Sequence, residues 1–197
     1  VENPSESLSH NVMGSSRVLE YANLVGAKRV IFASSAAADT PSSPYGVHKR
    51  MTELECRVYS DLYELDTVSL RYFNVYSEDQ KYGGAYSTVI SAWLEKIKNN
   101  EPLRLDGDGQ QTRDFIHVDD IVAANIHCMN YNNDFNGEVY DVGTGNSSSL
   151  SHIKQYFENV FDVTWELQPE RVGDIKHSKA NISKLETLGW TAQINLK

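Results

Sequence analysis

Tyr45 and Lys49 are four positions apart in a segment whose apolar spacing predicts a helix from Tyr45 to Tyr63. Residues four apart lie on one face of a helix, so the phenol and the ammonium would be neighbours. An ammonium beside a phenol stabilises the phenolate, which can take a proton from a substrate hydroxyl near neutral pH. A surface pair without a chemical role is the alternative, because a Tyr-x-x-x-Lys pattern arises often by chance.

Ser35 lies upstream of this pair, directly after a predicted buried strand that includes residues 29–33. Ligands of parallel α/β sheets bind at the carboxyl ends of strands, so the Ser35 hydroxyl could bind a substrate oxygen there. The alternative is that Ser35 only caps a turn or helix.

Further polar side chains follow later strands. Arg113 could hold a phosphate through two N–H groups, or it could pair with neighbouring acids. His117 beside an apolar strand is interpreted as structural. The aspartates at 106, 108, 119 and 120 lack the spacing of a calcium loop and suit turns and caps, so no metal site is predicted.

Helical and strand patterns alternate along the chain, which predicts an α/β fold with a parallel sheet. A helix is expected from about Asn11 to Val25. The later elements are a strand at 66–72, a helix at 86–98, a strand at 102–105, a partly extended segment at 113–118, a helix at 119–130, a strand at 138–142, a helix at 150–160, a strand at 163–167 and a helix at 181–188.

A doubly wound sheet normally begins with a strand and a glycine-rich turn that seats a pyrophosphate at a helix N-terminus. The given sequence contains no such turn before its first predicted helix. We therefore expect a partial doubly wound parallel sheet that lacks its first strands, with one edge and some apolar helix faces exposed.

Composition excludes several classes of function. The 197 residues carry a net charge of -9, which argues against a nucleic-acid or an anionic-membrane partner. No apolar run approaches the roughly 20 residues that span a bilayer, and no secretory signal is recognised. Only Cys56 and Cys128 occur, without disulfide or zinc spacing. We expect a cytoplasmic protein with two ordinary thiols.

Seven short segments together resemble one family. In chain order they are NVMG from Asn11, RVIFASSAA from Arg29, SPYGVHK from Ser43, LRYFNVY from Leu70, RDFIHVDD from Arg113, YDVGTG from Tyr140 and RVGDIKHS from Arg171. The series resembles the extended short-chain dehydrogenases/reductases of the NAD-dependent epimerase/dehydratase family, most of all the UDP-glucose and UDP-N-acetylglucosamine 4-epimerases. It runs from about Asn11 to Lys184.

The resemblance implies a Rossmann-like fold and an NAD-dependent 4-epimerase that acts through a 4-keto sugar. Tyr45 would be the base, Lys49 would stabilise its phenolate and hold the nicotinamide ribose, and Ser35 would bind the reacting hydroxyl. Asn11 and Phe73 would lie on the cofactor side. The sequence leaves NAD and NADP open, and cofactor binding is expected to be weak or absent without an N-terminal glycine-rich segment.

The same resemblance implies a UDP-sugar substrate and its binding residues. Asn74, Arg113 and Arg171 would face the diphosphate and Asp174 the ribose, while Leu103 to Asp106, with Arg104 and Asp106, would run along the uracil. Ser178 is small where many 4-epimerases carry a bulky aromatic residue, so N-acetyl sugars are expected to fit.

Two features of the segment after Ser35 refine these expectations. Dehydratases and decarboxylases of the family carry an acid just after the catalytic hydroxyl, whereas Ala36 and Ala37 stand here. This favours epimerisation. The stretch from Ser35 to Tyr45 is shorter than in most members, so the sequence alone does not place the two residues relative to each other.

The resemblance also predicts domains and a partner. Residues 1–76 and 115–145 would form the remainder of the Rossmann-like domain, and residues 77–114 and 146–197 a smaller α/β nucleotide-sugar-binding subdomain. A homodimer is expected through the helices at 9–25 and 44–63. The alternatives are a related nucleotide-sugar reductase or dehydratase, and a truncated nucleotide-sugar-binding protein without catalysis.

Overall fold

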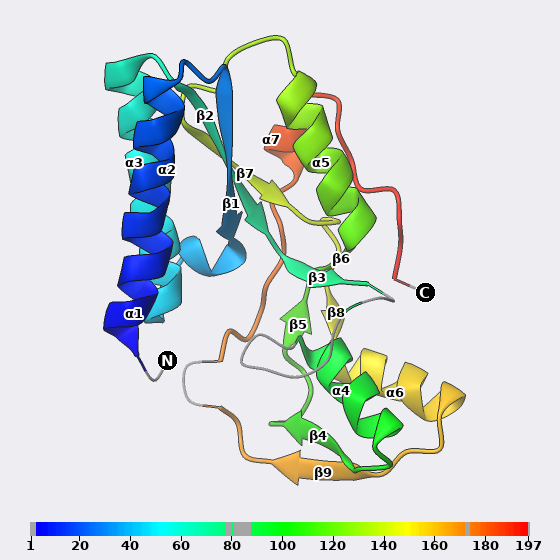
Figure 1. The fold of residues 1–197 in the computed structure, drawn as a ribbon. Coiled ribbons are helices and arrows are strands. Elements are labelled where there is room, and N and C mark those ends of the chain that lie inside the picture. The colour runs from blue at the N-terminus through cyan, green and yellow to red at the C-terminus, as the bar shows by residue number, and fades with distance from the viewer. Residues whose placement is uncertain (1–2, 78–79, 81–87, 172–173, 197) are drawn as a thin grey trace. The chain divides into compact units, whose positions relative to one another are not determined.

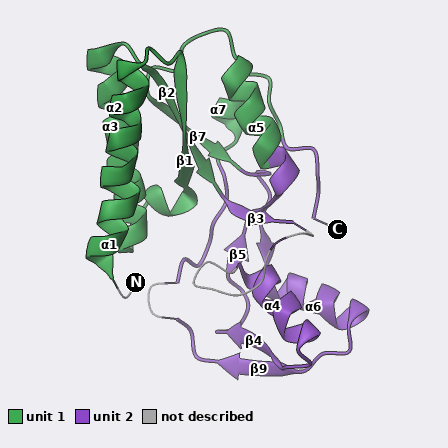
Figure 2. Ribbon diagram, in the orientation of Figure 1, with its two compact units in different colours: residues 1–72, 121–142, 181–191 green, residues 73–120, 143–180, 192–197 purple. Residues whose placement is uncertain are grey.

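The computed structural model describes residues 3–77, 80, 88–171 and 174–196 (Figure 1). The chain forms two compact units (Figure 2). Unit 1 consists of Val1–Tyr72, Ile121–Val142 and Asn181–Thr191, and unit 2 of Phe73–Asp120, Gly143–Ala180 and Ala192–Lys197.

Unit 1 is built on a parallel sheet in the order β1 (Arg29–Ser35), β2 (Asp66–Tyr72) and β7 (Glu138–Val142). The central strand β2 is buried along nearly its whole length, as a strand covered on both faces should be, although its sequence DTVSLRY includes polar and charged residues. Strand β1 lies at one edge and is mostly half-buried. The predicted parallel α/β arrangement is confirmed.

Helices cover both faces of this sheet. Figure 1 shows α2 (Gly14–Leu24) and α3 (Pro44–Tyr63) side by side on one face, and α5 (Val118–Asn130) and α7 (Ser183–Glu186) on the other. The core between α2, α3 and the sheet contains Leu19, Ala22, Cys56 and Leu65. Helix α3 begins where the Ser43 side chain accepts a hydrogen bond from the Gly46 N–H, with Pro44 at its first turn.

The first helix of unit 1 is longer than predicted and is not uniform. It begins as α1 (Pro4–Leu8), passes through a π-helical turn at Ser9–Met13 and continues as α2. The Asn3 side chain caps the start by accepting from the Glu6 N–H. A π-helical turn leaves no signature in apolar spacing, and such turns occur often at functional sites.

Among its described residues, unit 2 combines three pairs of short strands with two helices. The strands β3 (Asn74–Tyr76) and β6 (Phe115–His117) are parallel, as are β4 (Leu103–Asp106) and β9 (Trp165–Gln168), whereas β5 (Thr112–Arg113) and β8 (Ser148–Ser149) are antiparallel. The helices are α4 (Val89–Lys98) and α6 (Leu150–Val160).

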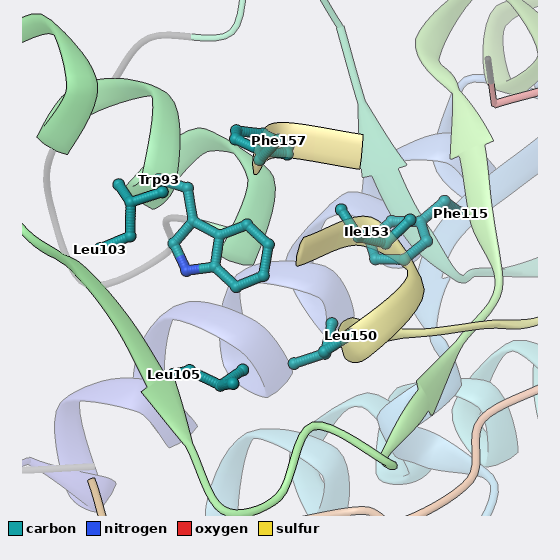
Figure 3. Packing of buried hydrophobic residues seen from close by; sticks show 7 residues of the cluster. All are labelled: Trp93, Leu103, Leu105, Phe115, Leu150, Ile153 and Phe157. Atoms are coloured by element: carbon teal, nitrogen blue, oxygen red, sulfur yellow. The ribbon is translucent and has the colours of Figure 1, made fainter. Parts of the chain in front are cut away.

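The core of unit 2 is centred on Trp93 of α4 (Figure 3). Its ring meets Phe157 and Trp165 edge-on at centroid distances of 5.3 and 4.9 Å. Its Nε1 donates to the Arg104 carbonyl at 2.8 Å. Helix α4 is thereby fixed to β4, the strand that the resemblance places along the uracil.

Most predicted elements are confirmed to within a few residues. The last helix is shorter than the predicted 181–188, and it ends near Gly189, whose φ of +86° suits glycine. Residues 86 and 87, where a helix was predicted to begin, lie outside the described residues. The strands β3 and β8 were not predicted, because runs of two or three residues show no periodicity.

The two units divide the chain at residues that differ from the predicted domains. Residues 73–76, 115–120 and 143–145 fall in unit 2, since β3 pairs with β6 there. Residues 181–191 fall in unit 1, where the Asn181 N–H donates to Asp141 and the Lys184 ammonium donates to the Val139 carbonyl.

Candidate functional site

The predicted site residues form two groups, one in each unit. Ser35, Tyr45, Lys49 and Asn11 belong to unit 1. Unit 2 contains the rest, which are Phe73, Asn74, Arg104, Asp106, Arg113, Arg171, Asp174 and Ser178.

Ser35 ends β1 at the carboxyl edge of the sheet. Its side chain accepts a hydrogen bond from the Ala37 N–H at 3.3 Å and so caps a 3₁₀ turn at Ala36–Ala38. The capping role that the sequence left open therefore exists. It engages the hydroxyl oxygen as an acceptor, so the hydroxyl hydrogen can still be donated to a ligand.

The turn after Ser35 packs directly against the start of α3. A Cβ on Gly46 would lie 2.3 Å from the carbonyl oxygen of Ala37, a distance that no real side chain tolerates. Only glycine permits this approach. The turn that follows Ser35 thus lies against Gly46, the residue directly after Tyr45.

Lys49 lies one helical turn after Tyr45, with its Nζ 5.8 Å from the Tyr45 ring centroid. The ammonium donates to the Ala33 carbonyl at 2.9 Å and lies 4.9 Å from the Phe32 ring centroid. Burial lowers the pKa of Lys49 from its ordinary value of 10.5. An ammonium has three N–H donors, and among the described residues only Ala33 accepts one, so two remain for a ligand.

A buried ionic network lies behind this pair. The Glu53 carboxylate accepts from both Nε and Nη2 of Arg71, at 2.8 and 2.9 Å, and from the Ser34 hydroxyl at 2.6 Å. Arg71 also pairs with Asp39 at 2.5 Å. These contacts join β2 and the residues after β1 to the end of β1, which carries Ser35, and to α3, which carries Tyr45 and Lys49.

The charge state of Glu53 follows from its partners. Burial alone would raise its pKa, but hydrogen bonds from Arg71, Ser34 and Arg50 outweigh burial and hold the pKa below the ordinary value. Glu53 is therefore an anion in the folded protein near neutral pH.

Asn11 lies in the π-helical turn. Its side-chain amide donates to the Ser7 carbonyl at 3.0 Å, and its own carbonyl accepts from the Thr52 hydroxyl at 3.2 Å. Asn11 thus links the first helix to α3 close to Lys49. Nearby, His48 is buried and its Nδ1 lies 3.0 Å from the Ser7 hydroxyl.

The second group of predicted residues surrounds a cavity of about 350 Å³ within unit 2. Its apolar lining residues include Val89, Ala92, Leu105 and Leu150. The described lining residues include four cations and two carboxylates, and Asn74 adds an amide. The cations are Lys96, Arg104, Arg113 and Arg171, and the carboxylates are those of Asp106 and Asp174. A cavity with an excess of positive charge in an acidic protein suits an anionic ligand.

Two sets of ion pairs organise these charges. Asp106 forms ion pairs with the Nε of Arg104 at 2.6 Å and with the Nε of Arg171 at 2.5 Å. Asp174 accepts from Nη2 of Arg113 at 2.7 Å, while Nη1 of Arg113 donates to the carbonyls of Thr112 and Ile175.

Two predicted residues of unit 2 are not among those lining this cavity. Phe73 is buried at 8 % exposure between β2 and β3. Ser178 is half-buried, and its N–H donates to the Thr112 carbonyl at 3.1 Å, next to Arg113. Their expected roles toward cofactor and sugar stay predictions.

Sequence reasoning missed several residues that hold the site. Glu53 follows Lys49 by four residues, as Lys49 follows Tyr45, and this spacing could have identified Glu53 as a residue on the same face of the helix. Asp114 is fully buried and accepts from the N–H groups of Thr144, Gly145 and Ala180. It lies between Arg113, which ends β5, and the start of β6, and it ties this point of the chain to residues 144, 145 and 180. Only its neighbour, Arg113, was singled out from the sequence.

Other classes of site are not found in the described part of the chain. No group of three or more His, Cys, Asp or Glu side chains there could hold a metal ion. None of the described helices is both long and apolar enough to cross a membrane. Burial raises the pKa of Cys56 to about 12 and that of Cys128 to about 11, so neither thiol is reactive near neutral pH.

Known proteins match this arrangement. The UDP-glucose 4-epimerase of Thermotoga maritima, solved with UDP-glucose, is 29% identical, with a TM-score of 0.91 over 99% of this chain and 68% of that one. The UDP-N-acetylglucosamine 4-epimerase of Methanobrevibacter ruminantium, solved with UDP-N-acetylmuramic acid, is 32% identical, with a TM-score of 0.86 over 94% of this chain and 64% of that one. The expected fold class is thereby confirmed.

A protein of Methanocaldococcus jannaschii, provisionally named UDP-glucose 4-epimerase, is 32% identical over 100% of this chain and 68% of its own length. The chain thus spans about two thirds of the length of such relatives. The model of the NAD dependent epimerase/dehydratase family matches residues 1–143. The resemblance seen in the sequence is confirmed, and the chain belongs to the NAD dependent epimerase/dehydratase family.

Proposed function

We propose that the protein is an NAD-dependent nucleotide-sugar 4-epimerase that acts on a UDP-hexose or a UDP-N-acetylhexosamine. The observation that carries the proposal is the Tyr45–Lys49 pair at the carboxyl end of a parallel strand, with the Ser35 turn packed against Gly46. Family membership and the epimerase names of the relatives support it.

Each catalytic residue has a role that its contacts support. Tyr45 would take the proton from the sugar C4 hydroxyl as the 4-keto sugar forms, and would return it afterwards. The Lys49 ammonium, held by the Ala33 carbonyl, would stabilise the phenolate. Ser35 would donate its hydroxyl hydrogen to the sugar O4, because its oxygen already accepts from Ala37.

The residues near Lys49 fit the ribose end of a nicotinamide cofactor. Lys49 keeps two N–H donors for hydroxyl groups, and the neighbouring Ala33 is exposed on the edge strand β1. NAD would supply a hydride acceptor and donor for C4. Asn11 and Phe73 are proposed as further residues on this side. The 197 residues alone are expected to bind NAD weakly, since they contain no glycine-rich pyrophosphate turn.

The cavity of unit 2 is proposed as the site of the UDP moiety. Its cationic side chains suit a diphosphate, and its apolar wall suits a base. Asn74, Arg113 and Arg171 are proposed for the diphosphate, Asp174 for the ribose, and Leu103–Asp106 for the base. Ser178 is proposed to leave room for an N-acetyl group.

The turn after Ser35 favours epimerisation over dehydration or decarboxylation. Ala36 and Ala37 carry no acid or base, and Asp39, the next carboxylate along the chain, is paired with the buried Arg71. A second proton transfer, which loss of water would need, has no available group in this turn.

A homodimer is proposed through α2 and α3. Both helices expose apolar side chains, including Leu24 at 80 % and Leu62 at 71 %. Light scattering should give twice the chain mass, and Leu54→Lys should shift it to the monomer. Ile126→Lys on α5, an equally exposed apolar position, should not. We further propose a cytoplasmic location, which suits the two unpaired buried cysteines.

The deciding experiment is a turnover assay of the full-length natural protein with NAD. Interconversion of UDP-GlcNAc with UDP-GalNAc, or of UDP-glucose with UDP-galactose, is followed by NMR without net NADH formation. Tyr45→Phe should abolish turnover and leave UDP binding unchanged. Net consumption of NADH would identify a reductase instead. Binding of UDP without turnover would identify a non-catalytic nucleotide-sugar-binding protein.

A further inference from the structure

Asp106 stands between two arginines at the end of β4. One carboxylate oxygen accepts a hydrogen bond from the Nε of Arg104, and the other forms an ion pair with the Nε of Arg171. The Asp106 side chain is only 12% exposed, whereas those of Arg104 and Arg171 are 53% and 64% exposed. The carboxylate is thus largely covered, while the two guanidinium groups remain open to solvent.

Both arginines use only their Nε atoms in these ion pairs. Within the described part of the chain, their terminal nitrogens have no polar partner. A guanidinium has five N–H donors, so each keeps four on its terminal nitrogens. Arg113 differs, because its Nη1 and Nη2 are already bound to Thr112, Ile175 and Asp174.

We propose that Asp106 is a positioning residue that presents Arg104 and Arg171 together to the diphosphate of a nucleotide. This rests on the proposed function and revises the roles of Arg104 and Asp106, which the resemblance places along the uracil. The carboxylate offsets the repulsion between two like charges and orients both through Nε. Their free terminal nitrogens then form one anion site, to which Arg113 adds charge but few free donors.

Removal of the Asp106 carboxylate should change UDP affinity in the opposite direction from the one that charge balance alone predicts. A carboxylate that lines an anion site repels the anion, so its removal should tighten binding. If Asp106 orients the two arginines, its removal frees both side chains and binding should weaken. The sign of the change therefore separates the two accounts.

The test measures UDP binding to the full-length natural protein by calorimetry, with Asp106→Asn against Asp108→Asn. Asp108 is exposed in the same turn, and its acceptance of the Gln110 N–H survives in asparagine. Both variants remove one negative charge. We expect Asp106→Asn to weaken UDP binding about tenfold, as for a lost charge-assisted contact, and Asp108→Asn to bind like the wild type.

Two further measurements keep the outcome unambiguous. Uridine, which lacks phosphate, should bind to wild type and Asp106→Asn alike, which shows that the cavity itself is intact. The double variant Asp106→Asn/Arg171→Ala should lose less UDP-binding free energy than the sum of the losses in the two single variants, because both substitutions act on one contact. Unchanged or tighter UDP binding by Asp106→Asn overturns the inference. A full-length wild-type protein that binds neither UDP nor uridine would instead refute the proposed function, and the inference with it.

Discussion

Gly46 in α3 and Ala37 in the 3₁₀ turn approach so closely that a Cβ on Gly46 would lie 2.3 Å from the Ala37 carbonyl oxygen. The obstacle is backbone, which cannot swing aside as a flexible side chain could. The contact sets the distance between the turn that Ser35 caps and the helical turn that carries Tyr45. Catalytic geometry in unit 1 thus depends on a residue without a side chain.

Gly46→Ala should therefore displace the Ser35 turn from α3. Overpacking of this kind costs about 1–3 kcal/mol, so urea unfolding of the chain should show that loss. Turnover by the full-length protein should fall further than stability alone explains. Gly14→Ala is the matched control, since its nearest contact would be an ordinary 3.8 Å to the Ser9 carbonyl. Equal behaviour of the two variants would contradict the argument.

Arg71→Met should destabilise unit 1 strongly. It leaves the Glu53 carboxylate, only 2 % exposed, without its bidentate partner. Breaking a buried pair from one side costs about 3–5 kcal/mol. Arg57→Met removes an arginine whose partners Asp61 and Glu138 are exposed, and it should change stability little. Urea midpoints for the two variants give the comparison, and a small loss for Arg71→Met would show that Glu53 finds other partners.

The same carboxylate predicts a dependence of stability on pH. The pKa of Glu53 is lower in the folded chain than its ordinary value of 4.5, so the unfolded chain binds its proton more readily. The resulting stabilisation is fully present above about pH 4.5 and is lost as the pH falls through the folded pKa. The stability advantage of wild type over Glu53→Gln should therefore be largest near neutral pH and shrink on acidification. A constant difference would mean that Glu53 contributes through shape alone.

Much of unit 1 could be predicted because its elements are long and periodic. The alternation that placed α3 and β2 arises from burial of whole faces, which sequence spacing records directly. The motifs around Tyr45 and Lys49 were visible for the same reason, since residues four apart must meet on a helix.

The supporting contacts could not be predicted because they join residues far apart in the chain. Glu53 and Arg71 meet through the pairing of α3 with β2, and Asp106 meets Arg171 across two loops. Polar pairs of this kind leave no periodic trace. The close approach of Gly46 to Ala37 could not be predicted either, because an isolated glycine inside a helix has several explanations.

Lys49 provides a final prediction about activity. Burial lowers its pKa from 10.5, so it loses its proton at a lower pH than an exposed lysine. The charged form is the one proposed to stabilise the Tyr45 phenolate. When the pH of the full-length protein is raised, kcat/KM should therefore start to decrease before pH 10.5 is reached, because Lys49 loses its proton.

Lys49→Arg separates this cause from general alkaline damage. Arginine stays charged throughout the range that enzymes tolerate, so the alkaline fall should move upward even if the variant is slower overall. Profiles of kcat/KM from about pH 6 to about pH 10 for both proteins give the answer. An alkaline limb at the same pH in both would assign it to another group. Lys49 would then act by holding the ligand rather than by its charge beside Tyr45.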